Sequence, residues 1–533
     1  MHTVQVRLRR DAGLSEPEET PGVVTLATPF GPATLRGLPP GAVAALRALA
    51  RGGTSEDELA RTVTEHDGEG GLLRWHLLLR KLSAGALLER AVLLVPSGGE
   101  AVVPSGGEAV VPSGGEAVVP SGGETVPSGG ETVPSGGEMA TAGAEPVAVL
   151  RPFGGGPLRP AAPLAADARV RLSRFAIAVP EDGRLVVRVP RSPLGVELAP
   201  AAAPLLGLLA DWTTPAGLAC PRLPAETTAA VLGLFADAGL LVRPTPEGED
   251  LERGAAPLAQ WSPADLWLHT RTREPRTTGR YGGTYPLRGV QDPLPVAPPA
   301  FAGPRIALEP PDLDAIAKTE ASLTDVLEAR RSIREHDAAA PITLDHLGEL
   351  LYRTMRQRRT FTGEDGQELA DRPYPSGGAV HELEVYPLVV SCEGLEPGLW
   401  HYAAHAHALE RVADPGPATR TLLDRARSAA MMTEDPQVLL IVTARFGRVM
   451  WKYETIAYSL ILKHVGVLYQ TFYLVATAMG LAVCGLGGGD AAEFAAASGL
   501  DPHAEGSVGE LLLGSRKGGV AGTPPGWSPE VPS

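Results

Sequence analysis

A pentapeptide repeat, Pro-Ser-Gly-Gly-Glu, interrupts this 533-residue chain and limits how it can fold. Ala-Val-Val or Thr-Val separates the copies, which begin at Pro96, Pro104, Pro112, Pro120, Pro127 and Pro134. Proline and glycine occur in every copy, and a period of seven or eight residues is too short for a unit that buries a core. We therefore predict a linker at 95–140, with separately folded parts on either side.

The two segments that flank this linker resemble each other. The first, 1–94, has a strand-like run followed by expected helices at 41–50, 55–65 and 72–83. The second, 141–250, has a strand at 185–189 and helices at 200–210 and 224–238. In both, a glycine then leads through leucines into a final strand, as in Gly239-Leu-Leu-Val. This order is the outline of a winged helix, so we predict two winged-helix-like domains.

Charge limits what these two domains can bind. The chain has 47 basic and 62 acidic residues, a formal charge of −15, whereas a nucleic-acid partner requires a basic surface. Two alternatives remain open. An extended peptide could add to the edge strand of a wing, as in a peptide clamp, or the domains could be purely structural.

The cysteines and the hydropathy pattern bear on the cellular compartment. Cys220, Cys392 and Cys484 are far apart, so no disulfide framework is expected, and a reducing cytoplasm fits. The N-terminus lacks the pattern of a signal peptide. The stretch 465–489 is uncharged and long enough to cross a bilayer. Its polar residues and glycines favour a buried helix or a subunit interface instead.

A linker with a short helix is predicted at 251–311, followed by a domain at 312–520 and a tail at 521–533. The helix that starts at Ser322 leads into Arg330-Arg331-Ser332-Ile333-Arg334. Three guanidinium groups and a hydroxyl within five residues suit an oxyanion such as a phosphate. A run of this kind is also common on a solvated helix end.

Two glycine-rich turns could bring backbone close to a ligand. Pro375-Ser376-Gly377-Gly378 precedes a strand, and its glycines let N–H groups approach a flat or anionic molecule. A tight turn is the alternative. The run 484–490 follows a long helix that begins near Lys452-Tyr453, so it is not a Rossmann fingerprint. The last strand ends at Arg516.

Three histidines fall in a predicted hairpin: His401, His405 and His407. No cysteine or carboxylate has a spacing that matches them for metal binding. We therefore expect a surface hairpin and no metal.

Taken in order, these motifs resemble the nitroreductase superfamily, and more narrowly the SagB-type dehydrogenases. These are azoline oxidases of thiazole- and oxazole-modified peptide pathways. The resemblance covers about 312–516, and 261–283 also looks like that group. The N-terminal part is similar to the peptide-clamp domains of cyanobactin oxidases.

The resemblance implies an α+β nitroreductase fold, an obligate homodimer and FMN at the dimer interface. Residues expected to contact the phosphate, ribityl and pyrimidine parts of FMN are Arg330, Arg331, Ser332, Arg334 and Arg516. Residues expected near the isoalloxazine are Pro375, Ser376, Gly377, Gly378, Leu486, Gly487 and Gly488. Gly514 stands where many nitroreductases have a lysine, so one positive charge is missing unless Lys517 replaces it.

Lys452 and Tyr453 match the Lys-Tyr pair of azoline dehydrogenases, and the reaction explains the need for them. Aromatising an azoline removes a hydride from one ring carbon, which FMN N5 accepts, and a proton from its neighbour. Tyr453 could take the proton as a phenolate beside the ammonium, or a desolvated Lys452 could be the base. Both alternatives remain open.

The implied activity is azoline oxidation in a ribosomally made peptide, with O₂ reoxidising the flavin and a cyclodehydratase as a further partner. An NAD(P)H-dependent nitro or quinone reductase is one alternative. A peptide-binding scaffold with an inactive flavin domain is another.

Overall fold

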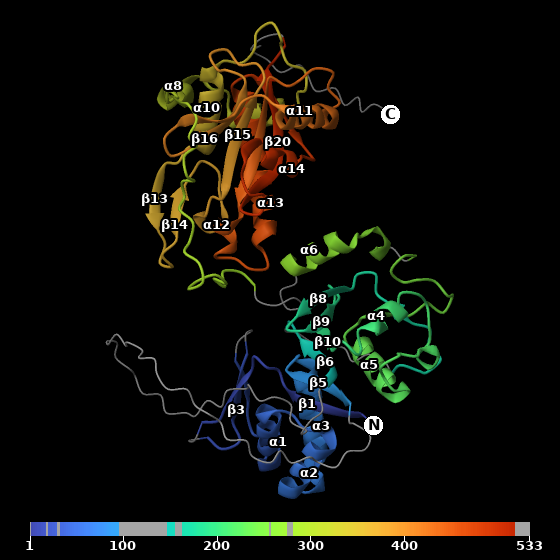
Figure 1. The fold of residues 1–533 in the computed structure, drawn as a ribbon. Helices are drawn as coiled ribbons and strands as arrows, with labels where there is room; N and C mark the ends of the chain where they lie inside the picture. The colour runs from blue at the N-terminus through green and yellow to red at the C-terminus, as the bar shows by residue number, and fades with distance from the viewer. Residues whose placement is uncertain are drawn as a thin grey trace, which may run out of the picture. The chain divides into compact units, whose positions relative to one another are not determined.

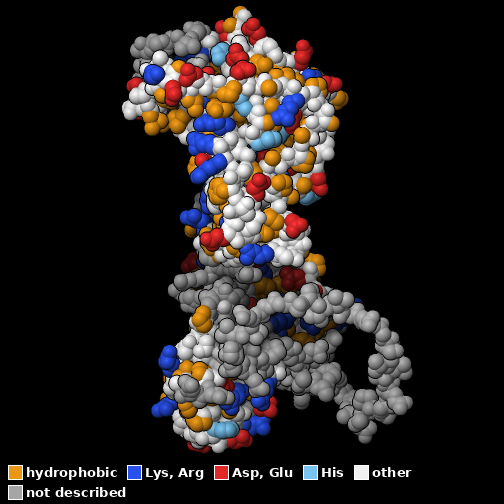
Figure 2. Space-filling view, turned by 90° about the vertical axis from the view of Figure 1, so that its left-hand side faces the viewer, with side chains coloured by type: hydrophobic (Ala, Val, Ile, Leu, Met, Phe, Trp, Pro, Cys, Tyr) orange, Lys and Arg blue, Asp and Glu red, His pale blue; other side chains and the backbone are white. Residues whose placement is uncertain are grey.

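The computed structural model describes residues 2–17, 20–28, 32–94, 146–154, 163–254, 257–273 and 281–517. The chain forms two compact units, Met1–Arg280 and Tyr281–Ser533 (Figure 1). The predicted linker at 95–140 and the tail at 521–533 lie outside the described residues. On the face shown in Figure 2, basic, acidic and apolar side chains are interspersed over both units.

The second unit starts earlier than the predicted boundary at 312. The segment before that boundary is tied to the C-terminal core by buried side chains. Arg445 donates to the carbonyl oxygens of Pro295 and Val296 at 2.9 and 2.8 Å. Trp451 Nε1 donates to the carbonyl of Gln291 at 2.8 Å. Residues 281–311 therefore belong to the C-terminal unit.

One antiparallel sheet runs through the N-terminal unit in the order β1-β5-β6-β10-β9-β8. Its strands are β1 (His2–Leu8), β5 (Leu88–Leu94), β6 (Pro146–Pro152), β10 (Leu194–Leu198), β9 (Arg184–Arg188) and β8 (Ile177–Glu181). Strands β5 and β6 flank the predicted linker and pair with each other, with Arg90 opposite Leu150. The two predicted domains therefore share one sheet.

The helices of the first half follow the predicted pattern. They are α1 (Pro40–Arg51), α2 (Glu56–Asp67) and α3 (Glu69–Ala84). Ser55 caps α2 by accepting from the Glu58 N–H. These helices enclose Leu46 and Trp75 together with a small sheet of β2 (Gly13–Ser15), β3 (Val24–Ala27) and β4 (Ala33–Leu35).

The second half of this unit has less helix than the first. Its elements are α4 (Pro204–Leu208), the 3₁₀ turn η1 (Pro215–Gly217), α5 (Ala225–Asp237), and the paired strands β7 (Arg171–Leu172) and β11 (Leu241–Val242). After η2 (Leu258–Gln260), α6 (Pro263–Arg273) confirms the predicted short helix. Trp267 attaches α6 to this half by donating to the Phe175 carbonyl at 2.8 Å. A winged-helix assignment for either half stays a prediction.

The C-terminal unit is built on a seven-stranded antiparallel sheet, in the order β12-β17-β16-β15-β18-β20-β19. The strands are β12 (Arg305–Ala307), β17 (Ala408–Ala413), β16 (Gly398–Ala403), β15 (Leu383–Val389), β18 (Val438–Arg445), β20 (Glu505–Ser515) and β19 (Leu481–Leu486). Strand β18, with the continuous apolar run expected of a strand covered on both faces, lies centrally.

Helices cover both faces of this sheet (Figure 1). Helices α10 (Leu344–Met355) and α13 (Ala457–Ala478) pack on one face, and α11 (Pro417–Ala430) and α14 (Ala491–Ser498) on the other. The remaining elements are α8 (Leu313–Thr319), α9 (Leu323–Ala329), β13 (Arg359–Thr362), β14 (Glu368–Asp371), η3 (Gly377–Ala379) and α12 (Phe446–Met450).

The uncharged stretch 465–489 is divided between α13 and β19. Within the described residues, α13 alone has the length and apolar composition of a membrane span. One side of α13, including Ile461, Leu468 and Phe472, is buried in the core of the unit. Other side chains, including Leu462 and Val467, are exposed in the single chain. The exposed residues also include Lys463 and Gln470, and the predicted subunit interface at this helix stays a prediction.

The surface-hairpin prediction is wrong for two of the three histidines, since His401 and His407 are buried. His401 lies between Glu384 and Glu410, with N···O distances of 3.3 and 3.4 Å. The hairpin of β16 and β17 is interior to the sheet, a long-range arrangement that local spacing does not reveal. Among the described residues, no group of three or more His, Cys, Asp or Glu side chains is placed to hold a metal ion.

Candidate functional site

The arginine run lies at the edge of the C-terminal sheet. Helix α9 is capped by Ser322, which accepts from the Asp325 N–H at 3.2 Å, and it ends at Ala329. The chain then extends beside β19, where the Ile333 N–H donates to the Val483 carbonyl at 3.0 Å. The run is therefore a backbone-anchored edge segment.

Tyr473 of α13 organises this segment. Its hydroxyl lies 2.9 Å from Ser332 Oγ and accepts from the Gly485 N–H at 2.8 Å. The Arg330 guanidinium lies over the same ring, 5.3 Å from its centre. The sequence motifs did not include Tyr473, although a tyrosine within an uncharged helix was the available signal.

The end of β20 meets the arginine run. The backbone of Arg516 pairs with that of His336, and the Asp337 N–H donates to the Ser515 carbonyl at 3.2 Å. We call Arg330, Arg331, Arg334 and Arg516 the arginine cluster. Within the described ranges, none of the four has a carboxylate within ion-pair distance. A group of cations without acidic partners suits an anionic ligand.

Gly514 has a packing explanation. A Cβ atom there would lie 2.5 Å from ring atoms of His336, so a side chain at this position would displace that ring. Burial lowers the pKa of His336 to about 4, which leaves the imidazole neutral near pH 7. Lys517 lies 3.6 Å from the Glu335 carboxylate, so an acid already faces this candidate replacement for the missing lysine.

A second group of predicted residues lies around η3. The Ser376 hydroxyl accepts from the His381 N–H at 3.0 Å, and the Gly377 N–H donates to His464 Nε2 at 2.8 Å. His464 Nδ1 lies 2.7 Å from a carboxylate oxygen of Glu382. Because Nε2 accepts, the imidazole proton is assigned to Nδ1, which donates to Glu382. His464 and Glu382, which the sequence motifs did not include, therefore hold the loop.

The same loop touches Lys452 and Tyr453. Gly378 has φ +64°, and a Cβ atom there would lie 2.6 Å from Tyr453 Oη and 3.4 Å from Lys452 Nζ. Both the backbone conformation and the available space therefore require glycine. We call Ser376–Gly378, Lys452 and Tyr453 the glycine-loop cluster; the neighbouring Pro375 is exposed.

Lys452 is placed by parts of the chain that no motif indicated. Its Nζ lies 3.3 Å from the Asp365 carboxylate, and its carbonyl accepts from the Tyr285 N–H at 3.0 Å. Burial alone lowers the pKa of Lys452, but the charges of Tyr285, Asp365 and Tyr453 outweigh it and the pKa is raised. Lys452 is therefore an ammonium ion at neutral pH.

The loop after β19 lies near the arginine cluster, through the bond between Tyr473 and Gly485. Leu486 is buried, whereas Gly487 has open space at its Cβ position. Gly488 helps to line a cavity of about 540 Å³ with residues of α11 and with Glu510. Burial raises the pKa of Glu510 to about 7. Among the described residues, no hydrogen bond or ion pair joins this loop to the glycine-loop cluster.

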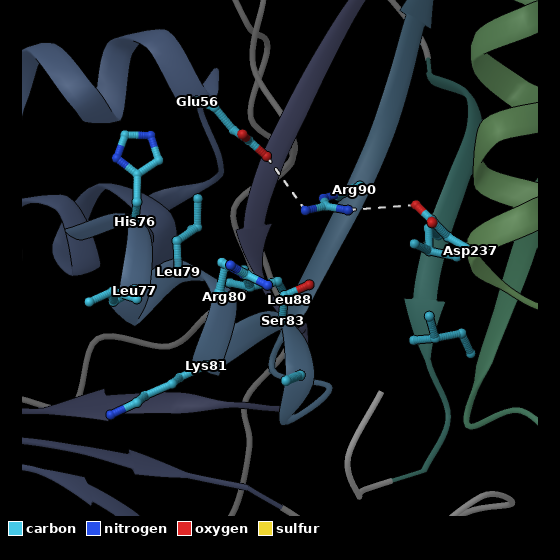
Figure 3. A pocket seen from close by; sticks show the side chains of 13 residues that line it. Glu56, His76, Leu77, Leu79, Arg80, Lys81, Ser83, Leu88, Arg90 and Asp237 are labelled. Carbon is cyan, nitrogen blue, oxygen red and sulfur yellow. Dashed lines mark ion pairs between the residues drawn. The ribbon is translucent and has the colours of Figure 1, made fainter. Parts of the chain in front are cut away.

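The N-terminal unit has a cavity of about 650 Å³ between α3 and the sheet (Figure 3). Its apolar lining includes Leu79, Leu88 and Leu150. Arg90 crosses it, with ion pairs of 3.6 Å to Glu56 and to Asp237. Arg80 and Lys81 also line it, and neither has an ion pair within the described ranges.

Strand β5, which follows α3, lies between β1 and β6. Both edges of β5 are therefore already paired, and a peptide that adds to this sheet would have to pair with another strand. The edges of the six-stranded sheet are β1 and β8.

Comparisons with known protein families match the two units of the chain to different family models. Residues 327–514 match the nitroreductase family model. Residues 170–278 match a second model, described as cyanobactin oxidase ThcOx. The C-terminal part thus carries a nitroreductase-like α+β domain, which supports an oxidoreductase.

Two relatives match parts of the chain. The putative nitroreductase MJ1384 of Methanocaldococcus jannaschii is 29% identical over 185 residues, 35% of this chain and 85% of that protein. The microcin B17-processing protein McbC of Escherichia coli is 34% identical over 116 residues, 21% of this chain and 42% of McbC. A chain in the solved E. coli microcin synthetase McbBCD complex with truncated pro-MccB17 has 23% identity and a TM-score of 0.30, covering 45% of this chain and 85% of that one.

Proposed function

We propose that this protein is an FMN-dependent dehydrogenase that oxidises thiazolines or oxazolines in a ribosomally synthesised peptide to thiazoles or oxazoles. The observation that carries the proposal is the contact of Gly378 with Lys452 and Tyr453 inside a nitroreductase-family domain. In this contact, a glycine loop that a flat ligand could approach lies beside two side chains that could transfer a proton. Similarity to a microcin-processing protein and to a cyanobactin oxidase model supports a modified peptide as substrate.

The residues present fit FMN. Arg330, Arg334 and Arg516 would hold its phosphate, since these guanidinium groups have no carboxylate partner within the described residues. The backbone of Gly377 and Gly378 would lie against the ring system. A side chain on Gly378 would collide with Tyr453, and one on Gly377 would press on His464. When bound, FMN supplies a two-electron acceptor at N5 that O₂ can reoxidise.

The side chains of this unit supply the proton chemistry. An azoline loses a proton from one ring carbon and a hydride from its neighbour, and the proton requires a base within hydrogen-bond reach. Tyr453 Oη and Lys452 Nζ lie beside the same glycine and are the groups proposed to do this. Both are half-buried, which limits competition from water.

We propose that the N-terminal unit binds the precursor peptide. The cavity beside α3 combines leucine side chains with Arg80 and Lys81, so it suits a peptide with apolar and acidic residues. A homodimer, with the exposed side of α13 at its interface, a cyclodehydratase partner and a cytoplasmic location belong to the same proposal.

The alternative function is NAD(P)H-dependent reduction of nitro or quinone compounds, which the similarity to a putative nitroreductase favours. An inactive flavin domain on a peptide-binding scaffold is disfavoured, because the arginine cluster and the Lys-Tyr pair are both present.

Incubating the FMN-loaded protein with azoline-bearing peptides in air tests the proposal. The expected result is a mass loss of about two hydrogens per ring, from removal of a hydride and a proton. Rapid bleaching of the flavin by NAD(P)H, with the cognate peptide unchanged, would instead establish the reductase. A colourless protein that binds peptide tightly would establish the scaffold.

A further inference from the structure

Lys452 lies in a largely enclosed ion pair. Its side chain is 16% exposed and that of Asp365 is 7% exposed, with 3.3 Å between Nζ and the carboxylate. The two residues come from different parts of the unit, since Asp365 lies in the turn between β13 and β14 and Lys452 follows α12. The fold therefore brings a carboxylate to the amine that the proposed chemistry uses.

The turn fixes the Asp365 carboxylate independently of Lys452. Asp365 Oδ1 accepts from the Gln367 N–H at 3.1 Å. The Gly363 N–H closes the turn by donating to the Gln367 carbonyl at 2.9 Å, and Gly366 has φ +84°. The hairpin thus presents a preorganised acceptor to Lys452.

Tyr285 completes the surroundings of Lys452. Its N–H donates to the Lys452 carbonyl, and its hydroxyl interacts with both Asp365 and Lys452. Tyr285 has φ +50°, a conformation that is uncommon for a residue with a side chain. Its ring is held edge-on by Trp451 at 5.7 Å and covered by the Arg288 guanidinium at 4.6 Å. Contacts on several sides therefore maintain an otherwise unfavourable backbone conformation.

Three segments of the unit bring charged or titratable groups close to Lys452. The β13–β14 turn contributes Asp365, and the segment before β12 contributes Tyr285 and, over its ring, Arg288. The segment after α12 contributes Tyr453, with its ring centre 5.9 Å from Nζ, and Glu454, which accepts from Thr284. Asp365 is the carboxylate within ion-pair distance of Lys452 among the described residues.

A neutral Lys452 would leave the enclosed Asp365 carboxylate without its countercharge, which is costly in a protein interior. We propose that Asp365 and Tyr285 are positioning residues that keep Lys452 as an ammonium ion, so that Tyr453 is the proton acceptor. This inference rests on the proposed azoline oxidation. In that reaction a C–H bond of the ring breaks, its proton forms a bond to the Tyr453 phenolate oxygen, and the neighbouring carbon gives its hydride to the flavin. The Lys452 ammonium would attract this oxygen electrostatically.

Asp365→Asn separates the two possible roles of Lys452 by the sign of its effect. The variant loses the carboxylate that raises the pKa of Lys452, so the amine loses its proton at lower pH. If the ammonium is required, the fall in kcat at high pH moves to lower pH. Above the pKa of Lys452, kcat falls by about tenfold for each further pH unit, because the fraction of Lys452 that is protonated falls tenfold. If Lys452 is the base, the same variant gains activity at neutral pH, and the proposal is overturned.

Lys452→Arg provides a second test, because a guanidinium remains charged and cannot serve as a base. We expect it to retain at least about tenfold more activity than Lys452→Ala. Equal inactivity of the two variants would contradict the proposal. Tyr285→Phe removes one hydroxyl and should shift the high-pH limb in the same direction as Asp365→Asn, by a smaller amount.

The protonation state can also be observed without turnover. The chain has five lysines, Lys81, Lys318, Lys452, Lys463 and Lys517, so ¹³C-methylation of the FMN-loaded protein gives a simple NMR spectrum. Loss of a signal in Lys452→Arg assigns it. We expect the Lys452 signal to titrate about one pH unit or more lower in Asp365→Asn.

Asp371→Asn, in the same hairpin but facing Arg358 and Arg359, is the matched control and should leave the Lys452 titration unchanged. An identical Lys452 titration in wild type and Asp365→Asn would overturn the inference. Absence of azoline oxidation with the expected titration would instead overturn the proposed function alone.

Discussion

The arginine cluster and the glycine-loop cluster both contain cations, but they treat charge in opposite ways. Within the described residues, the four guanidinium groups of the arginine cluster have no carboxylate partner, and Arg331, Arg334 and Arg516 are exposed. Lys452, in contrast, is enclosed and paired with Asp365. A cation without a carboxylate partner can bind an anionic ligand. A cation paired with a carboxylate is instead kept charged and in a fixed orientation by that partner.

The two clusters share α13. Tyr473 bonds to Ser332, and His464 bonds to Gly377. Nine residues along a helix correspond to about 14 Å, so one rigid element sets the separation between the residues proposed to hold the cofactor and those proposed to transfer the proton. The comparison therefore predicts that substitutions in one cluster alter binding and substitutions in the other alter turnover.

The largest expected effect is on turnover. Tyr453→Phe removes the proposed proton acceptor and should reduce kcat for azoline oxidation by about 10²- to 10⁴-fold. The protein should remain yellow, because the arginine cluster is unchanged. Absorbance of bound flavin and peptide mass spectrometry measure the two properties. Loss of flavin from this variant would break the division of roles between the clusters.

The next effect is on stability. His464→Ala removes the Nδ1 donor from Glu382, whose side chain is fully buried, and leaves only the longer contact with Ser376. The free energy of unfolding should fall by about 1.5–3 kcal/mol, the contribution of a hydrogen bond to a charged group. Glu382→Gln in the His464→Ala background should recover part of this loss, because it removes the buried charge. Denaturant unfolding of the full chain measures both, and no recovery in the double variant would contradict this account.

A smaller effect is expected on flavin affinity. Arg334→Ala and Arg516→Ala should each weaken FMN binding by about 10- to 100-fold, equivalent to the 1.5–3 kcal/mol of a charge-assisted hydrogen bond. At saturating FMN, kcat should be close to wild type. Arg331→Ala is the matched comparison, since its guanidinium already donates to the Glu328 and Arg330 carbonyls. Fluorescence titration should give it the smallest loss, and an equal loss for all three would show that position within the cluster is irrelevant.

Local sequence patterns predict some of these features and not others. Helices α1 to α3 and strand β18 follow from hydrophobic periodicity, capping and continuous apolar runs, which are properties of short segments. The pairing of β5 with β6 was not predicted, because it joins strands separated by the linker. The motif identified Gly378, but its contact with Tyr453 depends on the tertiary structure and could not be predicted from it.

The partners of the motif residues were missed for the same reason. No local pattern marks these partners, which are Tyr285, Asp365, Glu382 and Tyr473. Their role follows from the fold, which brings them to Lys452, His464 or Ser332. Motifs thus identify candidate ligand-binding groups, whereas the residues that hold these groups in place come from distant segments.

The smallest expected effect tests whether the net charge around the arginine cluster limits its affinity for FMN. Glu335 lies beside the cluster and pairs with Lys517 at 3.6 Å, and both side chains are exposed. Glu335→Gln removes a negative charge and leaves Lys517 without this partner, so FMN should bind more tightly by up to about 1 kcal/mol at low salt. The gain should disappear near 1 M salt, where charges are screened beyond about 3 Å. Glu328→Gln, seven residues earlier and near the end of α9, is the control. A gain in affinity that persists at high salt would mean that the variant changes the shape of the site. The difference in charge pairing between the arginine cluster and Lys452 would then not explain FMN affinity.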